Sequence, residues 1–68
     1  MRDPNRLNNF YDDFKILHKT HFPDWRFGQL INNFFSWILT EKKRDIFFIE
    51  ENVMLDYFSE FCSFMKKK

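Results

Sequence analysis

The chain is 68 residues long with a formal net charge of +1, and it contains one cysteine, two histidines, eleven phenylalanines and no alanine. One cysteine excludes an internal disulfide, and three Cys/His residues are too few for a four-ligand zinc site. The near-neutral charge gives no general electrostatic attraction to nucleic acid or anionic lipid. Because a core of this size is marginal, we expect stability to come from aromatic packing and self-association.

A first helix is predicted at residues 4–20. Asp3 is a favourable N-cap, and Pro4 fits the first helical position because its missing N–H is not needed there. Pro23 stops the helix, since the residue before a proline avoids the α region. One face of this helix carries the residues that we expect to be buried: Leu7, Phe10, Tyr11, Phe14, Leu17, His18 and His21.

A second helix is predicted at residues 24–41. The carboxylate of Asp24 is expected to cap the backbone N–H of Arg26 or Phe27. The helix is apolar on more than one face, which is typical of a central helix with two neighbours. The basic run KKR at residues 42–44 follows, where positive charge interacts favourably with the helix dipole. The main buried face is expected to consist of Phe27, Leu30, Ile31, Phe34 and Ile38.

A third helix is predicted at residues 50–65, after the apolar run Ile46–Ile49. That run is too short for periodicity to assign, so we expect a turn or a short extended segment there. No internal repeat or linker indicates a second domain, and the expected fold is a small all-α, three-helix domain spanning residues 1–68. The buried face of the third helix is expected to contain Met54, Tyr57, Phe58, Phe61, Cys62 and Met65.

The expected location follows from hydropathy. No N-terminal segment has the order of a signal peptide, and no apolar stretch approaches the roughly 20 residues that a bilayer requires. We therefore expect a cytoplasmic protein with a reduced thiol and no membrane partner. Abundant Phe, Lys, Asn and Ile beside absent Ala is typical of an AT-rich coding genome, which indicates a bacterial or phage source.

Few side chains suggest catalytic or metal chemistry. His18 and His21 are three residues apart with Asp24 nearby, but no further strong ligand is implied, and packing explains the pair better. Cys62 lies on an apolar helix face, where a free thiol behaves as a small hydrophobic residue. Adjacent acids do not converge on one substrate atom, and no phosphate-binding or nucleophile-elbow motif occurs. We expect no catalytic residue, metal, cofactor or enzymatic activity.

Apolar residues outnumber those that three buried faces can accommodate. The surplus, which includes Ile16, Leu39 and Phe64, is larger than a domain of this size can hide. Because aromatic residues are enriched at interface hot spots, the favoured function is a protein-interaction or oligomerisation module, with a homodimer or a host protein as partner. The candidate partner-binding residues are Trp25, Arg26, Gln29, Asn33, Phe35 and Trp37.

A small nucleic-acid-binding regulator is the alternative. Helix-turn-helix domains are also small and three-helical, and basic residues occur at Arg26, 42–44 and 66–68. A recognition helix should expose several Arg, Lys, Asn and Gln side chains on one face, however, and only Gln29, Asn32 and Asn33 approximate this. Nucleic acid is therefore the second choice of partner.

Two blocks of the sequence combine residues in an unusual way, PDWRFGQLINN at residues 23–33 and DIFFIEE at residues 45–51. They resemble PDLRLGQLL-x-N and D-x-FY-x-ED, the pattern of a family of short, uncharacterised bacterial and phage proteins. The departures are Trp25, Phe27, Phe48 and Glu51. That family has no assigned activity, so the resemblance implies a fold-level relationship. The matching residues are Pro23, Asp24, Arg26, Gly28, Gln29, Leu30, Asp45, Phe47, Ile49 and Glu50.

Gly28 falls in the first turn of the predicted second helix, where glycine costs roughly 1 kcal/mol relative to alanine. We expect the close approach of another backbone, that of residues 45–48, to offset this cost. Arg26 would then pair with Asp45, Glu50 or the first turn of the third helix, and the Gln29 amide would satisfy backbone groups of that irregular segment. Alternatively, Arg26, Gln29, Asn32 and Asn33 form an outer binding surface.

Overall fold

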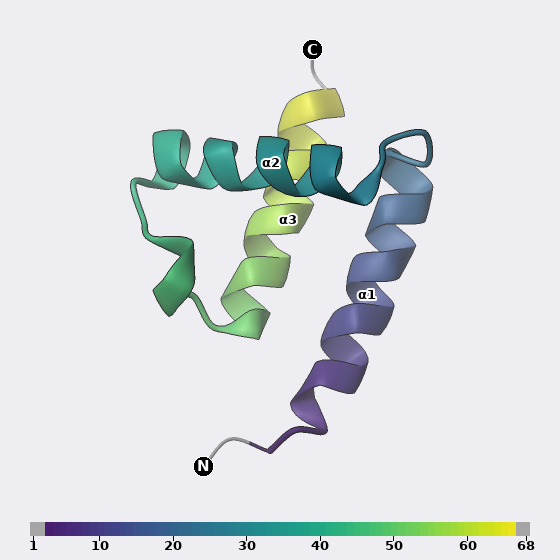
Figure 1. The fold of residues 1–68 in the computed structure, drawn as a ribbon, viewed down its shortest axis with the longest axis vertical. Helices are drawn as coiled ribbons and strands as arrows, with labels where there is room; N and C mark the ends of the chain where they lie inside the picture. Colours follow the sequence, from purple (N-terminus) through teal and green to yellow (C-terminus); the bar gives the residue numbers. More distant parts are fainter. Residues whose placement is uncertain (1–2, 67–68) are drawn as a thin grey trace.

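The computed structural model describes residues 3–66, and these form three α-helices and no strand (Figure 1). The first two are α1, Arg6–His21, and α2, Phe27–Trp37. A π-helical turn, η1, continues α2 over Ile38–Lys42. A 3-10 turn, η2, covers Ile46–Phe48, and α3 spans Glu51–Lys66. The predicted all-α, three-helix fold and the turn in the segment 46–49 are confirmed, whereas residues 67 and 68 of the basic tail lie outside the described residues.

Two of the helices form a parallel pair, and α2 lies across it. α1 and α3 lie side by side and run in the same direction, and α2 crosses α3 at a steep angle (Figure 1). The segment from η1 to η2 then returns the chain to the start of α3 (Figure 1). None of the helices among residues 3–66 combines the length and the apolarity needed to cross a bilayer.

The start of α1 matches the prediction only in part, because the N-cap position belongs to Asn5, whose side chain makes no cap hydrogen bond. The Asn5 N–H donates to Asp3 Oδ1 at 3.0 Å, although the regular helix begins at Arg6 rather than at residue 4. Arg6 Nε also donates to Glu51 Oε1 at 2.8 Å. This ion pair joins the first turns of α1 and α3.

The start of α2 differs from the prediction. The helix begins at Phe27, Asp24 lies in the preceding turn, and the N-cap position belongs to Arg26 without a side-chain cap. The physical reason is aromatic packing: the Trp25 N–H donates to the Phe22 carbonyl at 3.1 Å, and the two rings stack with centroids 4.5 Å apart. Because Phe22 is buried in the core, this turn outweighs the capping preference of Asp24.

Aromatic rings of α2 and α3 build the core. The predicted face of α3 is confirmed, with Cys62 and two phenylalanines buried and the rest half-buried. α1 has no fully buried residue, and the expected burial of Tyr11 and His21 is wrong because both are exposed. Phe14 of α1 still stacks on the core at 4.5 Å from Phe58. The buried residues are Phe22, Leu30, Phe34, Trp37, Ile38, Ile49, Phe58, Phe61 and Cys62.

Two aromatic residues of α2, Phe27 and Trp37, have environments opposite to those predicted from the sequence. Phe27, expected in the core, is 65% exposed, and Trp37, expected on a partner surface, is only 8% exposed. The crossing of α2 over α3 explains the burial of Trp37, whose ring centroid lies 5.5 Å from that of Phe61. The indole Nε1–H of Trp37 is buried without an acceptor among the described residues.

Candidate functional site

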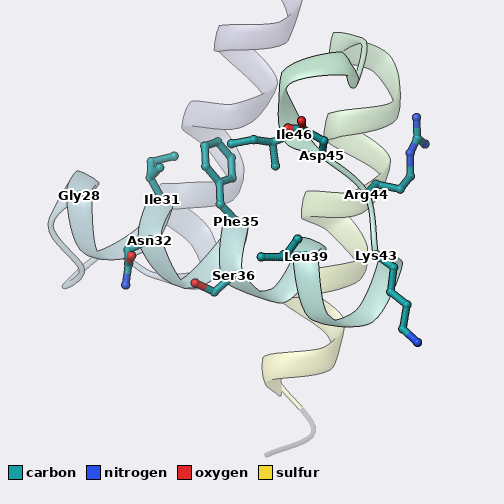
Figure 2. A pocket seen from close by; sticks show the side chains of 10 residues that line it. All are labelled: Gly28, Ile31, Asn32, Phe35, Ser36, Leu39, Lys43, Arg44, Asp45 and Ile46. Carbon is teal, nitrogen blue, oxygen red and sulfur yellow. The ribbon is translucent and has the colours of Figure 1, made fainter.

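An open groove runs along the outer side of α2. Its cavity volume is about 640 Å³, and most of the surface that lines it is apolar. One wall consists of side chains of α2 and the first turn of η1, and the other consists of the connection to η2 (Figure 2). We call it the α2 groove. Its lining residues are Gly28, Ile31, Asn32, Phe35, Ser36 and Leu39 on the first wall and residues 43–46 on the second.

The helical wall of the α2 groove carries two parallel ridges. Residues four apart on a helix form a row inclined to its axis, and the lining residues fall into two such rows. The apolar ridge is Ile31, Phe35 and Leu39, extended at its start by Phe27, and Phe35 points toward Ile46 across the groove (Figure 2). The small ridge is Gly28, Asn32 and Ser36.

Turn chemistry shapes the second wall. The Lys43 N–H donates to the Ile38 carbonyl at 3.0 Å, which closes the π-helical turn, and Lys43 adopts the left-handed conformation with φ 55°. The Phe47 N–H then donates to Asp45 Oδ1 at 2.9 Å, which begins η2. These bonds hold Ile46 opposite Phe35.

Residues of both sequence blocks line the α2 groove, and Gly28 makes no close contact there. Gly28 and Ile46 both line it, but a Cβ atom built on Gly28 would meet nothing within 4 Å. The predicted contact of Gly28 with the backbone of residues 45–48 is therefore wrong. The Arg26 carbonyl accepts the Leu30 N–H at 3.0 Å, but the Arg26 side chain makes no hydrogen bond or ion pair within residues 3–66. Its predicted pairing with Asp45, Glu50 or the first turn of α3 is therefore also wrong.

The candidate partner-binding residues do not form one surface. Phe35 alone lines the α2 groove. A second hollow of about 390 Å³ is lined by Trp25, Asn33 and Trp37 with parts of η1 and α3. The two remaining candidates, Arg26 and Gln29, are exposed outside both hollows. The sequence analysis missed the small ridge, which the four-residue spacing of Gly28, Asn32 and Ser36 could have revealed.

The basic run at 42–44 has a role beyond the helix dipole. Lys42 Nζ forms an ion pair with the Glu60 carboxylate and lies 5.6 Å from the Trp37 ring centroid and 5.5 Å from that of Tyr57. Arg44 donates to the Tyr57 hydroxyl at 2.9 Å. Two of the three cations therefore fasten the end of α2 to α3.

The remaining reactive groups serve the fold. His18 Nε2 lies 3.1 Å from the Trp25 carbonyl oxygen, which links α1 to the turn before α2. Burial raises the pKa of the Cys62 thiol to about 11, so Cys62 is protonated at neutral pH, as expected of an inert core thiol. Within residues 3–66 no three His, Cys, Asp or Glu residues gather as metal ligands.

Searches of protein families, curated proteins and solved structures return no match to this chain. The helical wall of the α2 groove offers apolar contact and neutral hydrogen-bonding groups, and its second wall carries the charged residues Lys43, Arg44 and Asp45. Inferences about function therefore rest on its residues.

Proposed function

We propose that the chain is a non-enzymatic protein-interaction or oligomerisation module that binds a protein surface through the α2 groove. The observation that carries this proposal is the absence of charge from Phe27 to Thr40, although α2 presents an exposed face along that stretch. A solvated helix face normally carries charged residues, whereas the cores of protein interfaces are depleted of them. The outer face of α2 has the composition of an interface.

Large exposed side chains in the groove and in the segment that follows its second wall support the same proposal. Leu39 is 65% exposed, and Phe47 and Phe48, which follow Ile46 in the chain, are 82% and 73% exposed. The rings of Phe47 and Phe48 contact each other edge-to-face with centroids 4.9 Å apart. An exposed pair of phenylalanines next to the second wall of the groove in sequence favours association with another protein.

The polar groups of the α2 groove support a non-enzymatic role. Asp45, whose Oδ1 accepts the Phe47 N–H, is its one carboxylate, and no histidine or cysteine lines it. Ser36 thus has no imidazole base beside it. The phenylalanine-rich, alanine-free composition further supports an accessory protein of bacterial or phage origin.

The nucleic-acid alternative is less well supported. Lys42 is engaged by Glu60 and Arg44 by Tyr57, so contact with phosphate would compete with bonds that hold the fold. A gel shift that weakens steeply with salt would be required to revive this alternative, because phosphate contacts release counterions.

A matched pair of substitutions tests the proposal. Leu39→Glu places a charge in the α2 groove, and Ile16→Glu makes the same change at a residue of α1 that is 57% exposed and lies outside the groove. The immobilised chain would be incubated with a bacterial lysate supplemented with an untagged copy, and retained proteins quantified by mass spectrometry. Binding of each retained protein would then be measured after purification.

We expect a ligand that Ile16→Glu retains and for which Leu39→Glu weakens affinity by about tenfold or more, because a buried unpaired charge is costly. The circular dichroism spectra of both variants should match the wild type. Equal retention of every protein by the two variants would contradict the proposal.

A further inference from the structure

We infer that the α2 groove is filled by the α2 helix of a second copy of this chain, in an antiparallel, two-fold symmetric dimer. This inference rests on the proposed function, since it names the partner of the same groove. A two-fold interface must be self-complementary, with one surface patch meeting its own copy. The two ridges of α2 provide such a patch, because one is large and apolar and the other is small.

The antiparallel register follows from the spacing of the ridges. When Leu39 of one copy lies opposite Gly28 of the other, Phe35 falls opposite Asn32 and Ile31 opposite Ser36. Each of these three large residues then meets a residue of the small ridge, in both directions at once. Rows spaced by four residues interdigitate in this way in the most common class of helix packing.

This arrangement accounts for Gly28. A Cβ atom there would meet nothing within 4 Å in one copy, so packing within the chain gives no reason for glycine in an exposed helical turn. In the dimer, the missing side chain leaves room for Leu39, which is 65% exposed in a single copy. In the dimer, Gly28 of one copy and Leu39 of the other therefore contact each other.

The chain exposes more surface than a compact domain of its size. The chain exposes 5341 Å², whereas a compact monomer of its mass is expected to expose about 4,700 Å². Its radius of gyration is 12.1 Å, compared with about 11 Å for a compact domain of this length. The surplus of about 600 Å² approaches the roughly 800 Å² that each partner contributes to a standard interface.

Electrostatics permit the contact. No charged residue lies between Phe27 and Thr40, so two copies meet without like-charge repulsion along α2. The antiparallel direction places the positive end of each helix dipole beside the negative end of the other, which is the favourable arrangement.

Two neighbouring asparagines provide the test. Asn32 and Asn33 are both exposed, but Asn32 lines the α2 groove and Asn33 lines the second hollow, about 100° around the helix. Asn32→Lys and Asn33→Lys therefore add the same charge to the same helix on different faces. Sedimentation equilibrium of the whole chain and both variants, from micromolar to millimolar concentration, measures the dimer dissociation constant of each.

We expect a monomer–dimer equilibrium for the wild type, an increase of about tenfold or more in the dissociation constant for Asn32→Lys, and less than about threefold for Asn33→Lys. A wild-type monomer at every concentration, or dissociation by Asn33→Lys alone, would overturn the inference. If the wild type is monomeric while another protein shows Leu39-dependent binding, only the identity of the partner is refuted. If neither is found, the proposed function falls as well.

Discussion

Lys43 shows how one residue positions a whole wall of the α2 groove. It holds the only left-handed backbone conformation among the non-glycine residues of 3–66, with φ 55° and ψ 42°. Helices commonly end at such a residue, and glycine is preferred there because a Cβ atom makes the conformation unfavourable by about 1–2 kcal/mol. The π-helical turn and the return toward Ile46 both depend on this strained position.

Replacing Lys43 by glycine should therefore stabilise the chain. We expect Lys43→Gly to raise the free energy of unfolding by about 0.5–1 kcal/mol, the relief of strain being partly offset by the greater freedom of glycine in the unfolded chain. The control is Lys15→Gly in the exposed interior of α1, which should lower it by about 1 kcal/mol. Urea denaturation of both variants gives the comparison, and destabilisation by both would show that the left-handed turn is not strained.

At the scale of elements, the positive charge of Lys42 links the end of α2 to α3. The ammonium group of Lys42 lies near the rings of Trp37 and Tyr57 and pairs with Glu60. The Lys42 and Glu60 side chains are 26% and 52% exposed, so solvent screens the ion pair and its contribution is small. The two cation–π contacts lie closer to the core and are expected to provide most of the stabilisation.

The substitution Lys42→Met keeps the aliphatic stem and removes the charge. We expect a loss of about 1 kcal/mol in the free energy of unfolding, while Lys19→Met, the same change on the exposed side of α1, should alter it by less than about 0.5 kcal/mol. Thermal unfolding at low and high salt measures both. Because cation–π contacts near the core are less screened than surface pairs, most of the loss in the free energy of unfolding should persist in high salt. If the loss vanished in high salt, the ion pair with Glu60 would be its main source instead.

The sequence predicted elements better than orientations. Periodicity identified all three helices because each carries an apolar stripe, and the buried face of α3 was correct because that helix contacts both others. Periodicity does not reveal crossing angles, however. Phe27 shares a stripe with Leu30 and Phe34 yet is exposed, and Trp37 is buried because the crossing brings it to Phe61.

The candidate site was predicted only in part. Aromatic excess indicated an interaction surface, and Phe35 lies on the α2 groove. The groove itself depends on the turn from η1 to η2, and no pattern in the sequence specified the left-handed conformation of Lys43. Residues 23–33 and 45–51 were expected to meet at Gly28, but both blocks only line the groove, and a Cβ atom on Gly28 would meet nothing within 4 Å.

For the whole molecule, stability and association are coupled. A chain of this length hides only about 60% of the surface that its unfolded form exposes, and ligands that bind only the folded state add stability by mass action. If a second copy is such a ligand, the residues that complete the interface are not those that best stabilise one copy. Gly28 is the position where these two demands conflict.

Gly28→Ala should move the two properties in opposite directions. In dilute solution, where single copies prevail, we expect an increase of up to about 1 kcal/mol in the free energy of unfolding, because alanine favours the helix and its Cβ atom meets nothing. The same methyl group would press against Leu39 of the second copy and raise the dimer dissociation constant by about three- to tenfold. Urea denaturation at micromolar concentration and sedimentation equilibrium measure the two effects separately.

Ser36→Ala, which adds no bulk to the small ridge, should leave dimerisation nearly unchanged. An alanine at position 28 that strengthens both folding and dimerisation would contradict the proposed register, since the Gly28 contact is the closest approach that it contains.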